Sequence, residues 1–308
     1  MKIKPEKLHK GDTIGVISPA GALKDDVNLQ NAVKYFEKQG YKIKFAPHVL
    51  DKKACLAGED ADRLSDLENF FKDDEVKAIL CSRGGYGTFR ILDKIDFDLI
   101  RNNPKIFAGY SDITALLLNF TEKSDLITFH APLFASDFGG EVVDSYTAKI
   151  FLKVLTGKSE IPYEFPNTSP YHCINPGKVE TLLLGGNLAI ISALAGTPYL
   201  PDFSEKILFL EDIGEPLYKI DRMLMQLKLA GILENISGLL FTEFTAVEDT
   251  EEEDVVNLIS EFAENLNIPV GYGFPAGHGL QKATLPLGVN YFFDSADFKL
   301  RLTENYLK

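Results

Sequence analysis

The chain has 308 residues, 45% of them hydrophobic, and a formal net charge of −13 at pH 7. This composition excludes a disordered chain, and the length allows two folded domains of ordinary size. The negative charge argues against nucleic acid or an anionic membrane surface as the main partner, because both would repel it.

The cysteines and the N-terminus indicate a compartment. Cys55, Cys81 and Cys173 are too few and too widely spaced for a disulfide framework or a zinc knuckle, which suits a reducing environment. The first residues contain no apolar signal-peptide segment, and no run approaches the length of a membrane span. We therefore expect a cytoplasmic protein.

Apolar runs alternate with helix-period segments through the first half of the chain. Strands are predicted at residues 13–18, 41–46, 76–82, 106–108 and 126–129, and helices at 25–39, 59–71, from 88 onward and 113–120. This alternation predicts parallel strands joined by helical crossovers, and such sheets bind ligands at the carboxyl ends of their strands. The loops at 19–21, 83–87 and Ser111 all follow strands in this way.

A change of composition separates the second half. After a helix at 146–155, residues 161–177 carry four prolines among polar residues, which is typical of an interdomain linker. Further strands are predicted at 179–184, 206–210, 236–244, 270–274, 284–293 and 298–303, with helices beginning at 185, 217 and 251. The last two strands alternate in hydrophobicity and are expected to pair as antiparallel neighbours.

Ser111 stands between a buried strand and an apolar helix. A sharp strand-to-helix turn lifts a serine hydroxyl clear of the backbone and aims free helix N–H groups at a developing oxyanion. Ile113 replaces the second glycine of the usual Gly-x-Ser-x-Gly pattern, so the signal is incomplete. The simpler alternative is that Ser111 caps the helix.

The loop Arg83-Gly84-Gly85-Tyr86-Gly87 also joins a strand to a helix. Three glycines in four positions let backbone N–H groups approach a ligand closely. A phosphate cradle, an oxyanion hole and a plain tight turn all fit this pattern. Neither the dinucleotide motif nor the P-loop motif is present, so nucleotide binding has weak support.

A carboxylate and a histidine lie at other strand ends. Glu211, followed by Asp212, ends a predicted strand, although a helix-start acid is the simpler interpretation. His278 lies between two glycines that leave its ring accessible, and His130 is the rival candidate for a catalytic base. Serine, histidine and carboxylate together make a nucleophilic triad possible. No histidine pair has metal-ligand spacing, so no metal is expected.

Six motifs in a fixed order resemble those of the LD-carboxypeptidases, serine peptidases that include the microcin C self-immunity peptidases. They occupy residues 11–20, 82–87, 109–112, 185–188, 210–215 and 277–279. The resemblance implies an α/β fold with an N-terminal doubly wound, mostly parallel sheet domain and a smaller C-terminal α/β domain. We place the domains at 1–160 and 178–308, joined by the linker at 161–177, with the active site in the cleft between them.

The resemblance also implies roles for particular residues. Ser111 would be the nucleophile, His278 the general base and Glu211 the acid that orients it. The backbone N–H groups of Gly85 and Asp112 would form the oxyanion hole. No cofactor is implied, and members of this family are commonly homodimers.

The implied reaction is release of the terminal D-alanine from muropeptide tetrapeptides during cell-wall recycling. A microcin-type activity on peptidyl or aminoacyl nucleotides is the alternative, which the lack of tryptophan for base stacking disfavours. Arg83 is our candidate for binding the substrate carboxylate, because its guanidinium suits that group. Two further alternatives remain: a two-lobed protein that binds a ligand without cleaving it, and a nucleotide-dependent enzyme that uses the glycine loop.

Overall fold

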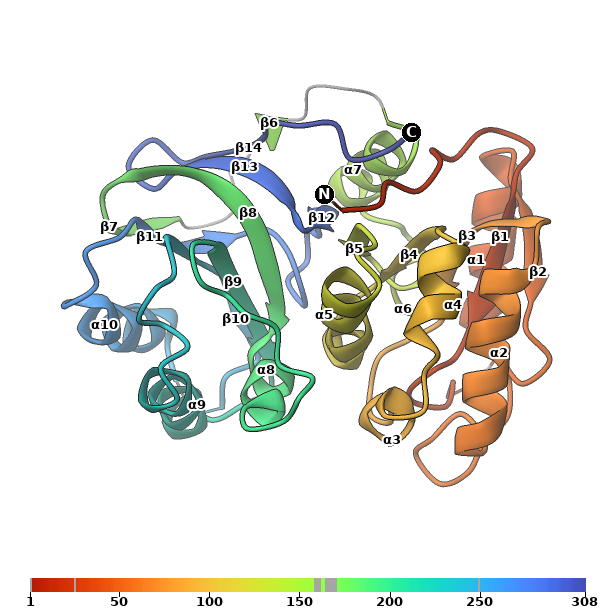
Figure 1. Ribbon diagram of the computed structural model, residues 1–308, viewed down its shortest axis with the longest axis horizontal. Helices are drawn as coiled ribbons and strands as arrows, with labels where there is room; N and C mark the ends of the chain where they lie inside the picture. The colour runs from red at the N-terminus through yellow and green to blue at the C-terminus, as the bar shows by residue number, and fades with distance from the viewer. Residues whose placement is uncertain (1, 25, 158–161, 164–170, 249) are drawn as a thin grey trace. The chain divides into compact units, whose positions relative to one another are not determined.

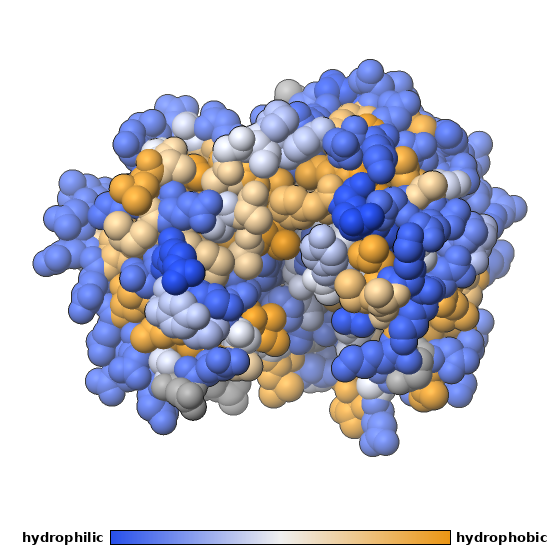
Figure 2. Space-filling model, turned by 90° about the horizontal axis from the view of Figure 1, so that it is seen from below, coloured by the Kyte–Doolittle hydropathy of each residue, from blue (hydrophilic) through white to orange (hydrophobic). Residues whose placement is uncertain are grey.

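The computed structural model describes residues 2–24, 26–157, 162–163, 171–248 and 250–308 (Figure 1). The chain divides into two compact units. One comprises Met1–Lys158 with Thr284–Pro286 and Tyr306–Lys308, and the other comprises Ser159–Ala283 with Leu287–Asn305. Every helix among the described residues is too short or too polar to traverse a lipid bilayer. Hydrophilic side chains cover much of the face shown in Figure 2, with hydrophobic ones gathered in patches.

The first unit is built on a sheet whose strands follow the order β12-β5-β4-β3-β1-β2. The strands are β1 (Thr13–Ile17), β2 (Lys42–Phe45), β3 (Val76–Cys81), β4 (Ile106–Gly109), β5 (Thr128–His130) and β12 (Leu285–Leu287). β1 to β5 pair in parallel. The order 2-1-3-4-5 is that of a doubly wound sheet, which confirms the predicted fold class.

Helices cover both faces of this sheet (Figure 1). The helices α1 (Val27–Lys38), α6 (Phe134–Phe138) and α7 (Ser145–Leu155) share one aromatic cluster around Phe36. The other face carries α2 (Asp60–Lys72), α3 (Phe89–Leu92), α4 (Phe97–Asn102) and α5 (Thr114–Lys123). There Phe71 and Phe120 pack on Phe107 of β4. Strands covered on both faces read as continuous apolar runs, which is why the sequence revealed them.

The second unit holds a mixed sheet in the order β6-β14-β13-β8-β9-β10-β11-β7. Its strands are β6 (Pro162–Tyr163), β7 (His172–Asn175), β8 (Lys178–Asn187), β9 (Ile207–Ile213), β10 (Gly238–Thr245), β11 (Val270–Phe274), β13 (Val289–Asp294) and β14 (Lys299–Leu302). β8 to β11 are parallel. β13 and β14 are antiparallel, as predicted. Its helices are α8 (Leu188–Leu194), α9 (Leu217–Leu229) and α10 (Glu252–Ala263).

The structure departs from the sequence prediction at several places. Residues 161 and 164–170 of the predicted linker lie outside the described residues, while 162–163 and 172–175 form the two edge strands of the second sheet. Edge strands tolerate proline, so this proline-rich composition is compatible with strands. Residues 284–286 and 306–308, placed in the C-terminal domain by sequence, belong to the first unit. Gly185 and Gly186 lie within β8, near its end, instead of opening a helix, and β9 continues past Glu211 to Ile213.

Candidate active site

Ser111 occupies a strained turn between β4 and α5. Its φ is +64°, in the left-handed region that side chains other than glycine rarely adopt. It is the first residue of a short 3-10 turn, η1 (Ser111–Ile113), and no side chain caps that turn, so the helix-cap interpretation is wrong. A Cβ atom on Gly84 would lie 2.9 Å from the Ser111 Oγ. The glycine loop therefore packs directly on the serine, and only glycine fits at position 84.

Asp112 joins this turn to the glycine loop. Its buried carboxylate accepts a hydrogen bond from the Thr88 N–H at 2.9 Å, and the Thr88 hydroxyl donates to the Asp112 carbonyl at 2.9 Å. Burial raises the pKa of the Asp112 carboxyl, against the effect of these hydrogen bonds. The Asp112 N–H belongs to the first turn of a helical segment, where N–H groups have no acceptor within the helix.

The peptide bond between Gly84 and Gly85 has a fixed orientation. The Gly84 carbonyl accepts a hydrogen bond from the Gly21 N–H at 3.1 Å. Because a trans peptide directs its C=O and N–H oppositely, the Gly85 N–H points away from the loop at 19–21. No acceptor for that N–H exists among the described residues. Gly85 thus offers a free donor on the loop that touches Ser111.

The buried side chain of Arg63 binds both the loop after β1 and the glycine loop after β3. Arg63, on α2, donates through Nη1 to the carbonyls of Pro19 and Gly87, the latter at 2.9 Å. Its Nη2 lies 2.6 Å from Asp60 Oδ1. Hydrogen bonds from Arg90 first, and from Arg63, hold the pKa of Asp60 at about 2. Arg63 had no signal in the sequence, because nothing in the local pattern of α2 reveals where its side chain ends.

In the second unit, Glu211 and His278 form a hydrogen-bonded pair. Glu211 Oε2 lies 2.6 Å from His278 Nδ1. The Glu211 side chain is fully buried in β9, whereas 13% of the His278 side chain is exposed. A Cβ atom on Gly277, whose φ is +80°, would lie 2.7 Å from Glu211 Oε2, so glycine is required there too. A buried carboxylate beside Nδ1 favours the tautomer that carries its proton on Nδ1.

Asp212, the residue after Glu211, makes a different set of hydrogen bonds. Successive strand residues face opposite sides, so its carboxylate turns away from His278. It accepts hydrogen bonds from Asn187 Nδ2 at 3.0 Å and from the Ala189 N–H at 2.9 Å. Burial, and next the charge of Glu211, raise the pKa of Asp212 to about 6. The Gly-Gly-Asn motif therefore supports the end of β9 beside Glu211.

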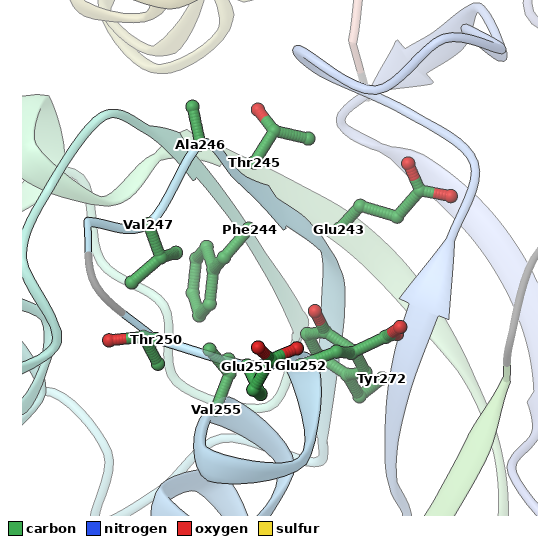
Figure 3. A pocket seen from close by; sticks show the side chains of 10 residues that line it. All are labelled: Glu243, Phe244, Thr245, Ala246, Val247, Thr250, Glu251, Glu252, Val255 and Tyr272. Carbon is green, nitrogen blue, oxygen red and sulfur yellow. The ribbon is translucent and has the colours of Figure 1, made fainter.

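A cavity of about 450 Å³ opens in the second unit where β10 and β11 end (Figure 3). Glu243, Phe244 and Tyr272 contribute to its lining. The Glu243 carboxylate points away from the Phe244 ring in Figure 3 and leaves no room for a Cβ atom on Gly279. The cavity wall thus reaches the residue that follows His278.

Two other residues were candidates from the sequence, His130 as a base and Arg83 as a ligand of the substrate carboxylate. His130, the rival base, is buried at the end of β5 with its ring 5.8 Å from that of Tyr110. Arg83 donates through Nη1 to the Ala22 carbonyl at 2.6 Å and lines two cavities of about 290 Å³ each in the first unit.

One group of possible metal ligands had no signal in the sequence. His48 lies 2.8 Å from Asp51 through Nδ1 and 3.8 Å from Asp62 through Nε2. The hydrogen bond to Asp51 is the main cause that raises the pKa of His48. Both ring nitrogens of His48 lie near carboxylates, an arrangement that favours the protonated imidazolium. The expectation that the protein binds no metal stays a prediction.

Comparison with known proteins identifies the family. Residues 14–131 match the LD-carboxypeptidase N-terminal domain and residues 180–292 match the LD-carboxypeptidase C-terminal domain. The chain belongs to the LD-carboxypeptidase family. It is therefore a peptidase-family protein of the carboxypeptidase type, as the resemblance predicted.

Three members illustrate the range of this LD-carboxypeptidase family. A probable murein peptide carboxypeptidase of Bacillus subtilis is 39% identical over 300 residues, covering 96% of this chain and 93% of that protein. The microcin C7 self-immunity protein of Escherichia coli is 28% identical over 331 residues, covering 97% and 95%. The crystal structure of muramoyltetrapeptide carboxypeptidase from Oxalobacter formigenes superposes with a TM-score of 0.83 at 30% identity, covering 94% and 97%.

Proposed function

We propose that this protein is a serine LD-carboxypeptidase that releases the terminal D-alanine from muropeptide tetrapeptides. The observation that carries the proposal is the buried Glu211 carboxylate 2.6 Å from Nδ1 of the partly exposed His278. That arrangement prepares an imidazole to accept a proton. The relatives named for murein peptides support the substrate class.

In the proposed mechanism Ser111 is the nucleophile, His278 the general base and Glu211 the acid that orients it. The Ser111 hydroxyl attacks the scissile carbonyl while His278 takes its proton and Glu211 stabilises the imidazolium. The N–H groups of Gly85 and Asp112 stabilise the oxyanion. His278 then protonates the leaving amine, D-alanine departs, and water hydrolyses the acyl-enzyme by the same route.

The Ser111→Ala variant tests the nucleophile. D-alanine release from a tetrapeptide muropeptide should fall by at least about 1,000-fold, because the acyl-enzyme cannot form. Circular dichroism checks that the fold is intact, and Ser65→Ala, on the exposed surface of α2, serves as the matched control. Undiminished turnover in Ser111→Ala would reject the assignment. Tight binding with an unchanged peptide mass in the wild type would instead favour a non-catalytic binder.

A microcin-type activity is the second candidate, because the Escherichia coli self-immunity protein aligns over 97% of this chain. A side-by-side assay on a muropeptide tetrapeptide and an aminoacyl-sulfamoyl adenosine separates the two activities. We expect faster turnover of the tetrapeptide. Thermal stabilisation by nucleotides alone would favour the nucleotide-dependent alternative.

We further propose a cytoplasmic homodimer, on the basis of the family resemblance. Light scattering on the purified protein should then give twice the chain mass of 34.2 kDa. A mass equal to that of the single chain across the working concentration range would reject the dimer.

A further inference from the structure

A small pocket of about 290 Å³ adjoins the glycine loop within the first unit. Gly85, whose N–H we assign to the oxyanion hole, forms part of its wall. Ala22 and Ala54 contribute small side chains, and Lys24, Lys52 and Arg83 contribute positive charge. Its volume is near the lower limit of about 300 Å³ for ligand pockets, which suits a ligand the size of a small amino acid.

The charge of this pocket is unusual for a chain with a net charge of −13. No carboxylate lines it among the described residues, and within that part of the chain neither Lys24 nor Lys52 has an ion-pair or hydrogen-bond partner. Lys53, the next residue, is paired with Glu59 outside the pocket. Positive charges that converge on a concave surface without counter-charges favour an anionic ligand.

The contacts of Arg83 show how close the positive charge of the pocket lies to the proposed oxyanion hole. Its Nη1 is fixed by the Ala22 carbonyl, and its Nη2 lies 3.4 Å from the position a Cβ atom would take on Gly85. The guanidinium is therefore next to the residue proposed to bind the oxyanion. In a C-terminal residue, only the amide nitrogen and Cα separate the scissile carbonyl from the terminal carboxylate, so one substrate reaches both groups.

We propose that Arg83, Lys24 and Lys52 form the binding pocket of the leaving amino acid and recognise its free carboxylate. This inference rests on the proposed function and makes its substrate more specific. Arg83 supplies a planar donor pair, and the two lysines add charge at the pocket wall. The volume of about 290 Å³ limits the leaving residue to a short side chain such as that of D-alanine. A peptide continuing beyond this position would carry no carboxylate here, so the pocket favours exopeptidase cleavage.

The first test compares a tetrapeptide ending in D-alanine with the same peptide ending in D-alaninamide. Wild-type protein should prefer the free acid by about 100-fold in kcat/KM. The double variant Lys24→Met/Lys52→Met should reduce that preference at least about tenfold, mainly through KM for the acid. Lys53→Met, which removes a paired lysine from the neighbouring position, should keep the preference of the wild type. An acid-to-amide preference that the double variant leaves unchanged would overturn the proposal.

A binding test separates failure of the pocket from failure of the proposed reaction. N-acetyl-D-alanine should shift the Gly85 amide resonance in a nuclear magnetic resonance titration of the Ser111→Ala protein. The two lysine substitutions should weaken that binding at least about tenfold. If the wild type hydrolyses neither peptide while this lysine-dependent binding persists, the reaction fails and the pocket stands. Binding of adenosine monophosphate that depends on the lysines, without binding of N-acetyl-D-alanine, would overturn the assignment to an amino acid.

Discussion

Gly84 and Gly277 each face a side chain of the proposed triad, and neither has room for a methyl group. A Cβ atom on Gly84 would lie 2.8 Å from the Cβ of Ser111, and one on Gly277 would lie 2.7 Å from Glu211 Oε2. Real Cβ atoms do not approach other atoms so closely, so a substitution must displace the neighbour. Gly84 and Gly277 therefore leave the space that Ser111 and Glu211 occupy.

Gly277→Ala should damage catalysis more than stability. The new methyl group pushes the Glu211 carboxylate off His278, and a misplacement of about 1 Å costs on the order of 100-fold in kcat. Gly196→Ala is the matched control, because Gly196 also has a positive φ, +84°, but no atom within 4 Å of its Cβ position. Both variants should lose about 1–2 kcal/mol of unfolding free energy from backbone strain. Steady-state kinetics and denaturant unfolding measure the two effects. Equal kcat values in the two variants would contradict the prediction that a methyl group on Gly277 displaces the Glu211 carboxylate.

At the scale of elements, the loops of the first unit depend on a side chain from a helix. The loops after β1 and β3 each contain a carbonyl that Arg63 binds from α2. The same guanidinium contacts Asp60, which exposed Arg90 also binds from α3. One buried arginine thus connects three segments beside Ser111, whereas Arg90 binds the same carboxylate from the surface.

Arg63→Met should lower the free energy of unfolding by about 3 kcal/mol. It leaves the buried Pro19 carbonyl without the donor from Arg63 and removes one of the two donors to the Gly87 carbonyl, which also accepts from the Arg90 N–H. Removing one partner of a buried network is far more costly than removing an exposed one. Arg90→Met removes an exposed partner of the same carboxylate and should cost much less. Urea unfolding followed by circular dichroism compares the two variants. Similar losses of unfolding free energy in the two variants would show that Arg63 contributes no more to stability than an exposed ion pair.

Sequence patterns predicted the long elements and failed on short ones for a physical reason. A helix such as α1 shows its period because Leu29, Ala32 and Phe36 face the core. The helices α4 and α6 have six and five residues, too few for a period to appear. Likewise, the charge that gathers around Arg83 comes from loops distant in sequence, so no local motif announces it. The resemblance to a family, not the residue pattern, selected Glu211 over Asp212.

At the scale of the whole molecule, the two ends of the chain belong to one unit. β12 joins the sheet of the first unit, and Tyr306–Lys308 return to it after the second unit is complete. The Lys308 N–H donates to the Pro5 carbonyl at 2.9 Å, close to the start of the chain. The first unit therefore cannot be completed without residues that follow the whole second unit in sequence, and a fragment ending near residue 158 lacks part of its core.

Substitutions at Tyr306 can test whether the first unit depends on the C-terminal residues. It is buried, its hydroxyl donates to the Val154 carbonyl at 2.9 Å, and its ring lies 6.3 Å from that of Phe129. Tyr306→Phe should cost about 1 kcal/mol for the lost hydrogen bond, and Tyr306→Ala about 3–5 kcal/mol for the lost packing. Hydrogen exchange resolved by peptide should show the loss of protection in residues 2–157, although the change lies at the opposite end of the chain. Tyr218→Ala, at an exposed tyrosine of α9, is the control and should leave that protection unchanged. Protection lost mainly in residues 171–283 after Tyr306→Ala would contradict the assignment of the C-terminus to the first unit.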